Sequence, residues 1–542
     1  MIRRLPPLPV SEPNFANLRQ DGNLYIDKTG FLQRLIEEGR WYFLARPRRF
    51  GKSLTLSTLE AMFQGRTDLF TGLSAEAWVE AQSKHPSPVV HLDLSLWDST
   101  GTPADLNAWL LDEVLALADH YQFSIAAKKT SAQALSFFLR KLCEAKGQVV
   151  VLIDEYDAPM LANLDDPQKV QCLRVVLREF YKVLKGSSSL IRFVFLTGIS
   201  KFTKAGIFSA LNNLEDISMS EDYSTLTGYT EHELVTYFHK YIIHTMQKLN
   251  YTEQDTFLEK VKKYYDGYCF DGKSKVYNPY SIVNFFKTSA FKNFWYESGS
   301  SSSVATYFQK YGINNPDTYR QCSVSPNFLS SFEIEKTTSE SFFYQTGYLT
   351  IAKIEENKII LDYPNTEIVN SMAQMFMDYI YKVPKYTNLA EDIWKSINIG
   401  DMESIIEHYN IELAAIPYVD FQNAGEGLYR AAFLLLLRSA RISAFSEIPT
   451  KNGRSDLIIE TQNFVLILEF KVARQKNEIA AKRQDGIKQF FEKNYITPYL
   501  HDKRKILPFV IVIDGEEHIA KAYEVKNKVS DIAKNSGPSR QK

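Results

Sequence analysis

The sequence predicts an α/β protein of several domains: a parallel sheet with flanking helices, a mostly helical middle region and a smaller C-terminal α/β domain. With 542 residues, the chain is longer than one hydrophobic core can serve. Apolar runs such as VVHLDLS and VVVLIDEYD alternate with helical stretches between positions 41 and 218, and such runs return after position 401. Between them the sequence is aromatic-rich and shows no regular strand alternation. We therefore predict domains at 1–218, 219–400 and 401–528, followed by a flexible tail at 529–542.

The composition excludes several classes of protein. Lysine and arginine number 63 against 64 acidic residues, so no overall field attracts nucleic acid, and any such contact must use a local patch. The four cysteines are scattered, which argues against a disulfide framework and against a structural zinc site. No apolar run approaches the roughly 18 residues that a membrane span needs, and the first residues lack the apolar segment of a secretion signal. We therefore expect a cytoplasmic protein without a membrane partner.

The segment WYFLARPRRFGKSLTLSTLEAMF predicts a strand, a loop and a helix in the order that a phosphate-binding loop (P-loop) requires. Backbone N–H groups of such a loop surround phosphate oxygens; after Gly51, Lys52 can reach the β- and γ-phosphates of ATP and Ser53 can ligate Mg²⁺. The first glycine of the pattern G-x-x-x-x-G-K-[ST] would fall at Arg46. A tripeptide GKS also occurs by chance in surface loops, so the assignment depends on its surroundings.

Three arginines, Arg46, Arg48 and Arg49, lie beside the predicted phosphate site. They could neutralise the charge of a triphosphate, or supply an arginine finger in cis or from a neighbouring subunit of a homo-oligomer. A solvated basic loop is an equally good interpretation of the same residues.

Two later apolar runs end in polar residues. VVVLIDEYD ends in Asp154 and Glu155, which suits a buried strand with acids at its carboxyl edge, where α/β sheets bind ligands. Asp154 would hold Mg²⁺ and Glu155 would polarise the attacking water; the alternative is that both only cap the next helix. RFVFLTGISK ends in Thr197, Ser200 and Lys201, which either sense the γ-phosphate or form a simple turn.

A second group of charged residues lies in GRSDLIIETQNFVLILEFKV. Glu469 and Lys471 are two apart, so in a strand they share one face, and a hairpin can bring Asp456 beside them. Burying such charges is costly unless a divalent cation compensates. Asp456, Glu469 and the Phe470 carbonyl could ligate Mg²⁺ while Lys471 orients the attacking water. The alternative is an exposed strand with a surface ion pair, which the apolar neighbours disfavour.

Two flanking helices offer further candidates. Glu426 lies on a predicted amphipathic helix from which it could project toward the metal. On the helix after the strands, Gln489 or Gln484 could position water or a phosphate. Residues 451–542 contain 18 basic against 12 acidic residues, a modest excess that suits contact with a nucleic-acid backbone or a solvated face alike.

Motifs along nearly the whole chain resemble a family of bacterial proteins with an AAA-ATPase-like N-terminal domain and a C-terminal PD-(D/E)XK nuclease-like domain. The resemblance is carried by ARPRRFGKSL, VVVLIDEYDAPM, FVFLTGISKFTKAGIFSALNNLEDIS, YDGYCF, VYNPYSI, QTGYLTI and GRSDLIIE with LEFKV. The family itself shows RPRRFGKS, with arginine in place of the first loop glycine. The resemblance implies a P-loop NTPase sheet followed by a restriction-endonuclease-like α/β domain.

By that resemblance the residues already singled out acquire roles. Lys52 and Ser53 match the P-loop, Asp154 and Glu155 the second nucleotide motif, and Asp456, Glu469 and Lys471 the nuclease core. The family's helix pattern, a glutamine six residues before a tyrosine, matches Gln489 and Tyr495 rather than Gln484.

The sequence therefore predicts a protein that binds and hydrolyses ATP and carries a Mg²⁺-dependent nuclease-like domain acting on DNA or RNA. The alternative is a nucleotide-controlled switch or scaffold whose nuclease fold is catalytically silent. Two conspicuous motifs, YIDKT around Asp27 and DGY around Gly267, indicate no role beyond turns and packing.

Overall fold

The computed structural model describes residues 5–125, 130–201, 213–297, 319–329, 338–375, 389–415, 426–440, 442, 444–450, 453–493, 495–499 and 502–525. The tail expected at 529–542 lies outside these residues. The chain forms two compact units, one of residues 1–303 with 319–368, and one of residues 369–542 with 304–318. The middle region up to residue 368 thus forms one unit with the N-terminal sheet.

The sheet of the first unit is entirely parallel and has the order β2-β3-β4-β1-β5. Its central strands are buried on both faces, which explains why they are continuous runs of β-branched and aromatic residues. The strands are β1 (Trp41–Ala45), β2 (Val89–Asp93), β3 (Val149–Asp154), β4 (Ile191–Gly198) and β5 (Glu215–Asp216).

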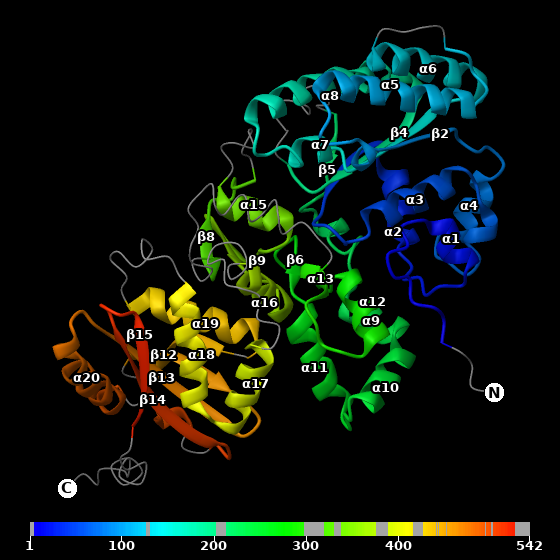
Figure 1. Ribbon diagram of the computed structural model, residues 1–542. Coiled ribbons are helices and arrows are strands. Elements are labelled where there is room, and N and C mark those ends of the chain that lie inside the picture. Colours follow the sequence, from blue (N-terminus) through cyan, green and yellow to red (C-terminus); the bar gives the residue numbers. More distant parts are fainter. Residues whose placement is uncertain are drawn as a thin grey trace. The chain divides into compact units, whose positions relative to one another are not determined.

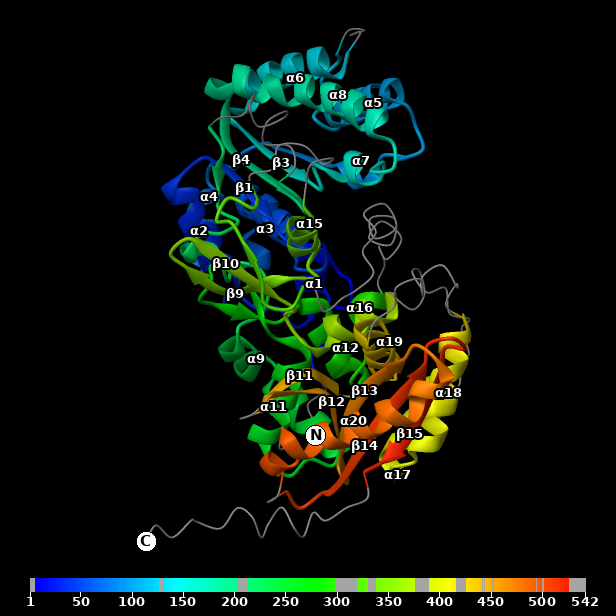
Figure 2. The same cartoon turned by 90° about the vertical axis from the view of Figure 1, so that its left-hand side faces the viewer.

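Helices cover both faces of this sheet (Figures 1 and 2), with α5, α6 and α8 on one side and α3 on the other. Start signals in the sequence fix several of them: Thr102 forms a capping box with Asp105 at the start of α5, and Asp166 caps α8. The helices are α1 (Phe15–Gln20), α2 (Thr29–Glu38), α3 (Lys52–Phe63), α4 (Glu76–Gln82), α5 (Pro103–His120), α6 (Ser131–Lys146), α7 (Ala158–Leu161) and α8 (Pro167–Gly186).

The carboxyl ends of the parallel strands meet at one edge. β4 lies between β1 and β3, with Ala45 opposite Gly198 and Ile153 opposite Leu196. The loop after β1 and the acids after β3 are therefore separated by a single strand, a distance of about 10 Å that two long side chains can bridge.

The middle region is mostly helical, as predicted, and also contains short antiparallel strands. Gly267 in the DGY motif has a φ of +106°, and a Cβ there would lie 2.1 Å from the Pro364 carbonyl oxygen, so the motif permits close approach of two chain segments. The elements are α9 (Glu231–Tyr237), α10 (His239–Lys248), α11 (Gln254–Tyr265), β6 (Tyr268–Cys269), β7 (Lys275–Val276), α12 (Pro279–Thr288), α13 (Phe294–Glu297), β8 (Cys322–Val324), α15 (Ser339–Thr346), β9 (Thr350–Glu355), β10 (Lys358–Asp362) and α16 (Thr366–Met375).

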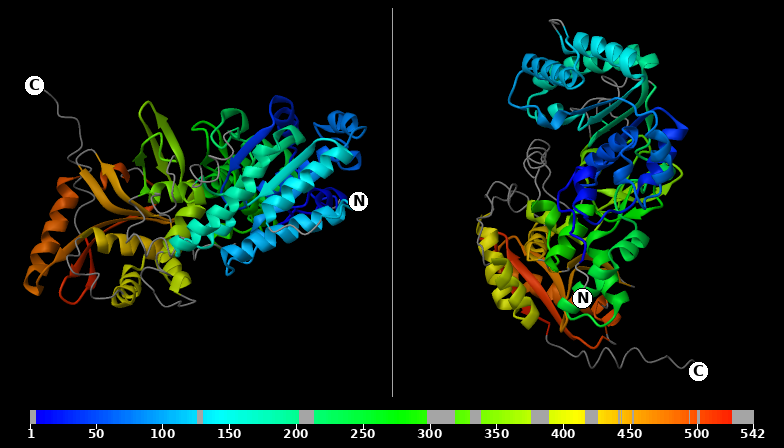
Figure 3. Two further views of the ribbon diagram at one scale, coloured as in Figure 1. Left: turned by 90° about the horizontal axis from the view of Figure 1, so that it is seen from above. Right: turned by 90° about the vertical axis from the view of Figure 1, so that its right-hand side faces the viewer.

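The second unit contains a mixed sheet of order β11-β12-β13-β14-β15, in which only the β13–β14 pair is parallel. Helix α20 packs on one face and α18 and α19 on the other (Figures 1 and 3). The elements are α17 (Leu389–Ile399), α18 (Met402–Ala415), α19 (Glu426–Ser439), β11 (Ala444–Thr450), β12 (Gly453–Glu460), β13 (Phe464–Ala473), α20 (Ile479–Glu492), β14 (Lys505–Asp514) and β15 (Ile519–Glu524). Among the described helices of either unit, none combines the length and apolarity that crossing a bilayer requires.

Helix α18 buries an acid, Glu412, that is only 4% exposed. Neither carboxylate oxygen accepts a hydrogen bond from a described residue, and burial raises the pKa of Glu412 from 4.5 to about 7. Between these two pH values the folded chain keeps a proton that the unfolded chain loses. The free energy of unfolding therefore falls as the pH rises from about 4.5 to about 7, by on the order of 2–3 kcal/mol.

We predict that Glu412→Gln, which cannot lose a proton, removes this part of the pH dependence. Scanning calorimetry of the full-length proteins between pH 5 and 8 should show a mutant Tm that exceeds the wild-type value increasingly as the pH rises. Parallel pH profiles of the two proteins would contradict the assignment.

Candidate nucleotide and metal sites

The loop between β1 and α3 has the backbone shape of a phosphate-binding turn. Gly51 has a φ of +86° and lies immediately before Lys52, the first residue of α3, while Arg49 has a φ of +69°. A Cβ on Gly51 would meet nothing within 4 Å, so this position needs glycine for its left-handed backbone and not for space. The first amides of α3 have no partner within the helix and are available to an anion.

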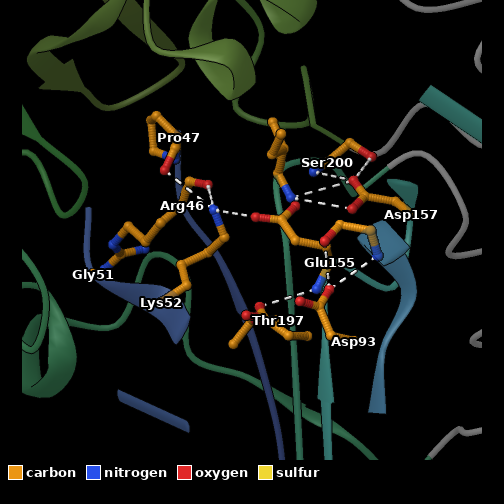
Figure 4. A network of polar contacts seen from close by, with 12 residues as sticks. Arg46, Pro47, Gly51, Lys52, Asp93, Glu155, Asp157, Thr197 and Ser200 are labelled. Atoms are coloured by element: carbon orange, nitrogen blue, oxygen red, sulfur yellow. Dashed lines mark hydrogen bonds and ion pairs between the residues drawn. The ribbon is translucent and has the colours of Figure 1, made fainter. Parts of the chain in front are cut away.

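Lys52 is folded back over this loop and is only 4% exposed. Its Nζ lies 3.1 Å from Oε1 of Glu155 and donates hydrogen bonds to the Arg46 and Pro47 carbonyls at 3.2 and 3.3 Å (Figure 4). Glu155 itself has a φ of +46°, an unfavourable backbone conformation for a glutamate. The ion pair thus joins the loop after β1 to the acids after β3 across the intervening strand.

A cavity of about 440 Å³ opens at this point, a volume suited to a small-molecule ligand. Six of the residues predicted from the sequence line it: Arg48, Arg49, Gly51, Lys52, Ser53 and Glu155. The structure therefore brings the loop, the start of α3 and one acid of the second motif together at one surface.

Much of the remaining cavity wall comes from segments that the sequence did not indicate as functional: residues of 9–13, 24–28, 226–229 and 279–283. The YIDKT motif is among them, with Tyr25 and Lys28 in the wall. Asp27 secures the motif by accepting hydrogen bonds from the backbone N–H groups of Thr29 and Ser74 at 2.9 and 2.7 Å. The conspicuous YIDKT motif could have indicated a functional role, but its local sequence does not show which part of the chain it contacts.

Asp154 and Thr197 lie at the same edge but not in the cavity wall as the described residues define it. Asp154 is 2% exposed, and its Oδ1 accepts hydrogen bonds from the Thr197 hydroxyl at 2.5 Å and from the Glu155 N–H at 3.0 Å. Thr197 thus fixes the orientation of the Asp154 carboxylate.

A neighbouring acid that the sequence did not indicate, Asp157, organises the end of β4. It is 1% exposed and accepts hydrogen bonds from the Ser200 N–H and hydroxyl at 2.7 and 2.5 Å (Figure 4). Burial and the charge of Glu155 raise the pKa of Asp157 to about 6. Ser200 is therefore hydrogen-bonded to Asp157, and Lys201 pairs with Asp216 at 2.9 Å; their role as γ-phosphate sensors stays a prediction.

The Arg46 side chain is not among those that line the cavity. It is 1% exposed and donates hydrogen bonds to the Ala45 and Ser218 carbonyls at 2.9 and 2.6 Å and to the Thr227 hydroxyl at 3.2 Å. The guanidinium carbon also lies 4.0 Å from the centroid of the Phe270 ring. The Arg46 side chain thus has protein partners, and direct binding of phosphate by Arg46 stays a prediction. The residue after a strand can turn its side chain to either side, and spacing alone does not say which.

In the second unit, Glu469 and Lys471 share one face of β13, as their spacing predicted. Lys471 Nζ lies 2.9 Å from Oε1 of Glu469 and donates to the Phe470 carbonyl at 3.0 Å. Burial alone would lower the pKa of Lys471, but the charge and hydrogen bond of Glu469, together with the charges of Glu426 and Asp456, raise it. The lysine is therefore a charged group held almost out of water.

Asp456 lies on β12 beside this pair. Regular pairing of β12 with β13 extends to Leu457 opposite Leu468. At the next position, the Asp456 side chain and not its backbone contacts β13: its Oδ2 accepts a hydrogen bond from the Phe470 N–H at 2.8 Å. Its Oδ1 pairs with Arg430 of α19 at 2.8 Å. The interruption of the ladder places a carboxylate next to Glu469, whose pKa it helps to raise.

The two flanking helices contribute as predicted to the surroundings of Lys471. Glu426 Oε2 lies 3.7 Å from Lys471 Nζ. On α20, Gln489 donates to the Tyr495 hydroxyl at 3.2 Å, and burial together with the charge of Glu469 raises the pKa of Tyr495. Gln484 is exposed on the same helix. The structure thus links Gln489, through Tyr495, to the carboxylates and leaves Gln484 in solvent.

Glu469 has the properties expected of a residue that can hold a divalent cation. It is 1% exposed, its Oε2 accepts no hydrogen bond from a described residue, and burial with the nearby Asp456 raises its pKa to about 7. A cation would relieve both the desolvation and the repulsion. No group of three or more acidic, histidine or cysteine side chains that could hold a metal occurs within the described parts of the chain.

Comparison with known proteins gives matches at both ends of the chain. Residues 9–208 match a family described as a predicted AAA-ATPase, and residues 424–523 match the PD-(D/E)XK nuclease superfamily. A relative from Azotobacter chroococcum mcd 1, described as an uncharacterized protein in the vnfD 5' region, is 30% identical over 503 residues, covering 91% of this chain and 93% of the relative.

Two solved structures from Aeropyrum pernix are similar at a much lower level. The ORC1 protein in complex with DNA is 9% identical over 66% of this chain and 94% of its own, with a TM-score of 0.27. The ORC2 protein in ADPNP–ADP complexes is 12% identical over 70% and 97%, with a TM-score of 0.26.

Helix α20 can approach β13 and β14 because Gly486 faces the sheet. A Cβ at Gly486 would lie 2.5 Å from Cγ1 of Val510 and 3.4 Å from Cγ of Lys471. Helix propensity alone favours alanine over glycine by up to about 1 kcal/mol, whereas overpacking against a buried strand costs about 1–3 kcal/mol. We therefore expect the cost of overpacking to exceed the gain in helix propensity.

We predict that Gly486→Ala lowers the Tm of the full-length protein and that Gly186→Ala, near the end of α8 where a Cβ would meet nothing within 4 Å, leaves it unchanged or slightly higher. Thermal unfolding of both variants checks this. A stabilised Gly486→Ala protein would show that α20 does not contact the sheet as described.

Proposed function

This chain belongs to the family of proteins that combine a predicted AAA-ATPase-like domain with a C-terminal PD-(D/E)XK nuclease superfamily domain, and on that premise we propose that it is an ATP-dependent, metal-dependent nuclease. ATP binds at the cavity beside Lys52, and the carboxylates around Lys471 support hydrolysis of phosphodiester bonds in DNA or RNA. The observation that carries the proposal is the pair of buried lysines, each held against a glutamate: Lys52 with Glu155 at the carboxyl edge of the parallel sheet, and Lys471 with Glu469 on the central strand of the mixed sheet.

At the nucleotide site the proposed chemistry is an exchange of partners. Lys52 is held by Glu155 and by two carbonyls of its own loop. Phosphate oxygens carry more negative charge than carbonyls and bind an ammonium ion more strongly. When the β- and γ-phosphates take over Lys52, Glu155 is released to orient the attacking water.

Other residues of the same edge assist. Arg49 lines the cavity and offers a second positive charge to the phosphates. Ser53 and Asp154 would hold the Mg²⁺ that accompanies ATP, which would offset charge on the phosphate oxygens. Thr197 keeps the Asp154 carboxylate oriented through their 2.5 Å hydrogen bond.

At the nuclease site Asp456 and Glu469 would hold a divalent cation, most simply Mg²⁺, whose chemistry is to polarise the scissile phosphate and its attacking water. Lys471 orients that water and stabilises charge on the phosphate. Glu426 and Gln489 border the site, the first near Lys471 and the second through Tyr495. Asp456 already pairs with Arg430 and accepts a hydrogen bond from the Phe470 N–H, and the charge of Arg430 competes with a cation for the carboxylate.

These contacts of Asp456 favour a second candidate function, a nucleotide-controlled switch or scaffold with a silent nuclease fold. Both oxygens of Asp456 are already satisfied by protein groups. If they stay so, the site remains closed to a cation and the domain binds nucleic acid or protein without cutting it.

The nucleotide assignment predicts different outcomes for the two partners of the ion pair. Lys52→Ala should weaken ATP binding at least about tenfold because the ammonium is lost. Glu155→Gln should bind ATP at least as tightly as wild type, because the competing carboxylate is gone, while hydrolysis falls about a hundredfold or more. Calorimetric titration and phosphate release measure these two quantities. The control is Lys182→Ala, which changes an exposed lysine of α8. If Lys52→Ala bound ATP as tightly as this control, the proposed site would be contradicted.

The nuclease assignment predicts metal-dependent cutting of DNA or RNA that Asp456→Asn and Lys471→Ala abolish. Independently of activity, Mn²⁺ should raise the Tm of wild type by binding the folded state, and should not raise that of Asp456→Asn combined with Glu469→Gln. Lys488→Ala, an exposed lysine of α20, should keep the Mn²⁺ effect. No cutting of single- or double-stranded substrates with Mg²⁺ or Mn²⁺, together with intact ATP binding, would favour the silent scaffold.

A further inference from the structure

Arg46, which replaces the first P-loop glycine, connects the loop to segments distant in the sequence through contacts of its side chain. Its guanidinium donates to the Ser218 carbonyl at 2.6 Å and the Thr227 hydroxyl at 3.2 Å. It also lies 4.0 Å from the ring centroid of Phe270. Each of these partners lies more than 170 residues further along the chain, and only an arginine offers a planar fork that can serve all three.

The main chain of the same residue holds the lysine of the loop. The Arg46 carbonyl and the next carbonyl, that of Pro47, accept hydrogen bonds from Lys52 Nζ at 3.2 and 3.3 Å. The Arg46 N–H in turn donates to the Gly198 carbonyl at the end of β4, at 3.1 Å. The position of Arg46 therefore sets where Lys52 can reach.

Two further contacts join the same loop to the middle region. Phe50 packs edge-on against the rings of Tyr268 and Phe270, with centroids 4.8 and 5.5 Å apart. A Cβ on Gly347 would lie 2.7 Å from Cβ of Pro47, so the turn at Gly347 approaches the loop closely. Residues of the motifs YDGYCF and QTGYLTI thus pack against the loop.

We propose that Arg46 is a positioning residue: it does not touch the nucleotide, but its ties to Ser218, Thr227 and Phe270 hold the loop so that Lys52 meets the phosphates. This deepens the proposed ATP site and rests on it. In a generic P-loop, glycine gives the loop its freedom; here buried contacts with the middle region set the loop instead. Nucleotide binding and the packing of the middle region are then coupled through one side chain.

The alternative is a direct contact between Arg46 and phosphate. That contact would require the guanidinium to leave its hydrogen bonds and the Phe270 ring, and to leave two carbonyls and a hydroxyl buried without a donor. Arg49 already lines the cavity, where such a contact can form.

A double-mutant cycle on the full-length protein separates these possibilities. ATP binding is titrated by calorimetry for wild type, Arg46→Met, Lys52→Ala and the double variant. Because Arg46 acts through Lys52, Arg46→Met should weaken binding about tenfold in wild type and less than about twofold when Lys52 is already absent. Equal weakening in both backgrounds would overturn the proposal, and a Lys52→Ala protein that binds as wild type does would overturn the proposed ATP site itself.

Two more variants keep the test decisive if Arg46→Met folds poorly. Arg46→Lys keeps the charge but not the fork, so it should bind ATP as weakly as Arg46→Met; recovery of wild-type affinity would indicate a direct phosphate contact. Phe270→Leu removes the ring beneath the guanidinium and should weaken ATP binding about threefold or more. Its control is Phe257→Leu, in the core around α11, which should bind ATP as wild type does. Equal ATP affinities of the two leucine variants would count against a role of the Arg46–Phe270 contact.

Discussion

Both candidate sites depend on the same physical constraint, that a lysine ammonium nearly removed from water must be surrounded by acceptors. Lys52 meets it with Glu155 and the carbonyls of its own loop, and Lys471 with Glu469 and the Phe470 carbonyl. In each case one partner is a glutamate that can be exchanged or shared when an anion or a cation arrives. The lysine is therefore positioned before any ligand binds, which lowers the cost of arranging it for chemistry.

The two units satisfy this constraint by different routes. In the parallel sheet, the lysine and its glutamate follow different strands, and the strand order places β4 between them, so the ion pair crosses a neighbour. In the mixed sheet, lysine and glutamate are two residues apart on β13, and the twofold period of a strand brings them together directly. The first arrangement depends on the packing of the whole unit, including the residues that hold the loop after β1. The second depends mainly on one strand and on the interrupted ladder at Asp456.

Features that depend on local sequence were predictable, and features that depend on the packing of distant segments were not. The four long strands of the first sheet and the strands β12, β13 and β14 are continuous apolar runs, and they were recognisable for that reason. β15 was not, because half of its residues face solvent and its sequence IAKAYE has little apolar signal. The Glu469–Lys471 pair followed from local spacing. The direction of the Arg46 side chain, the role of Asp157 and the cavity wall at Tyr25 depend on contacts between distant segments, which no local pattern encodes.

The most direct measurement is a crystal structure of the full chain with a non-hydrolysable ATP analogue and Mg²⁺. The account predicts that Lys52 Nζ leaves Glu155 and lies within hydrogen-bonding distance of the β- and γ-phosphate oxygens, with Arg46 still on Phe270. A nucleotide bound elsewhere, or bound in the cavity while Lys52 stays paired with Glu155, would contradict it.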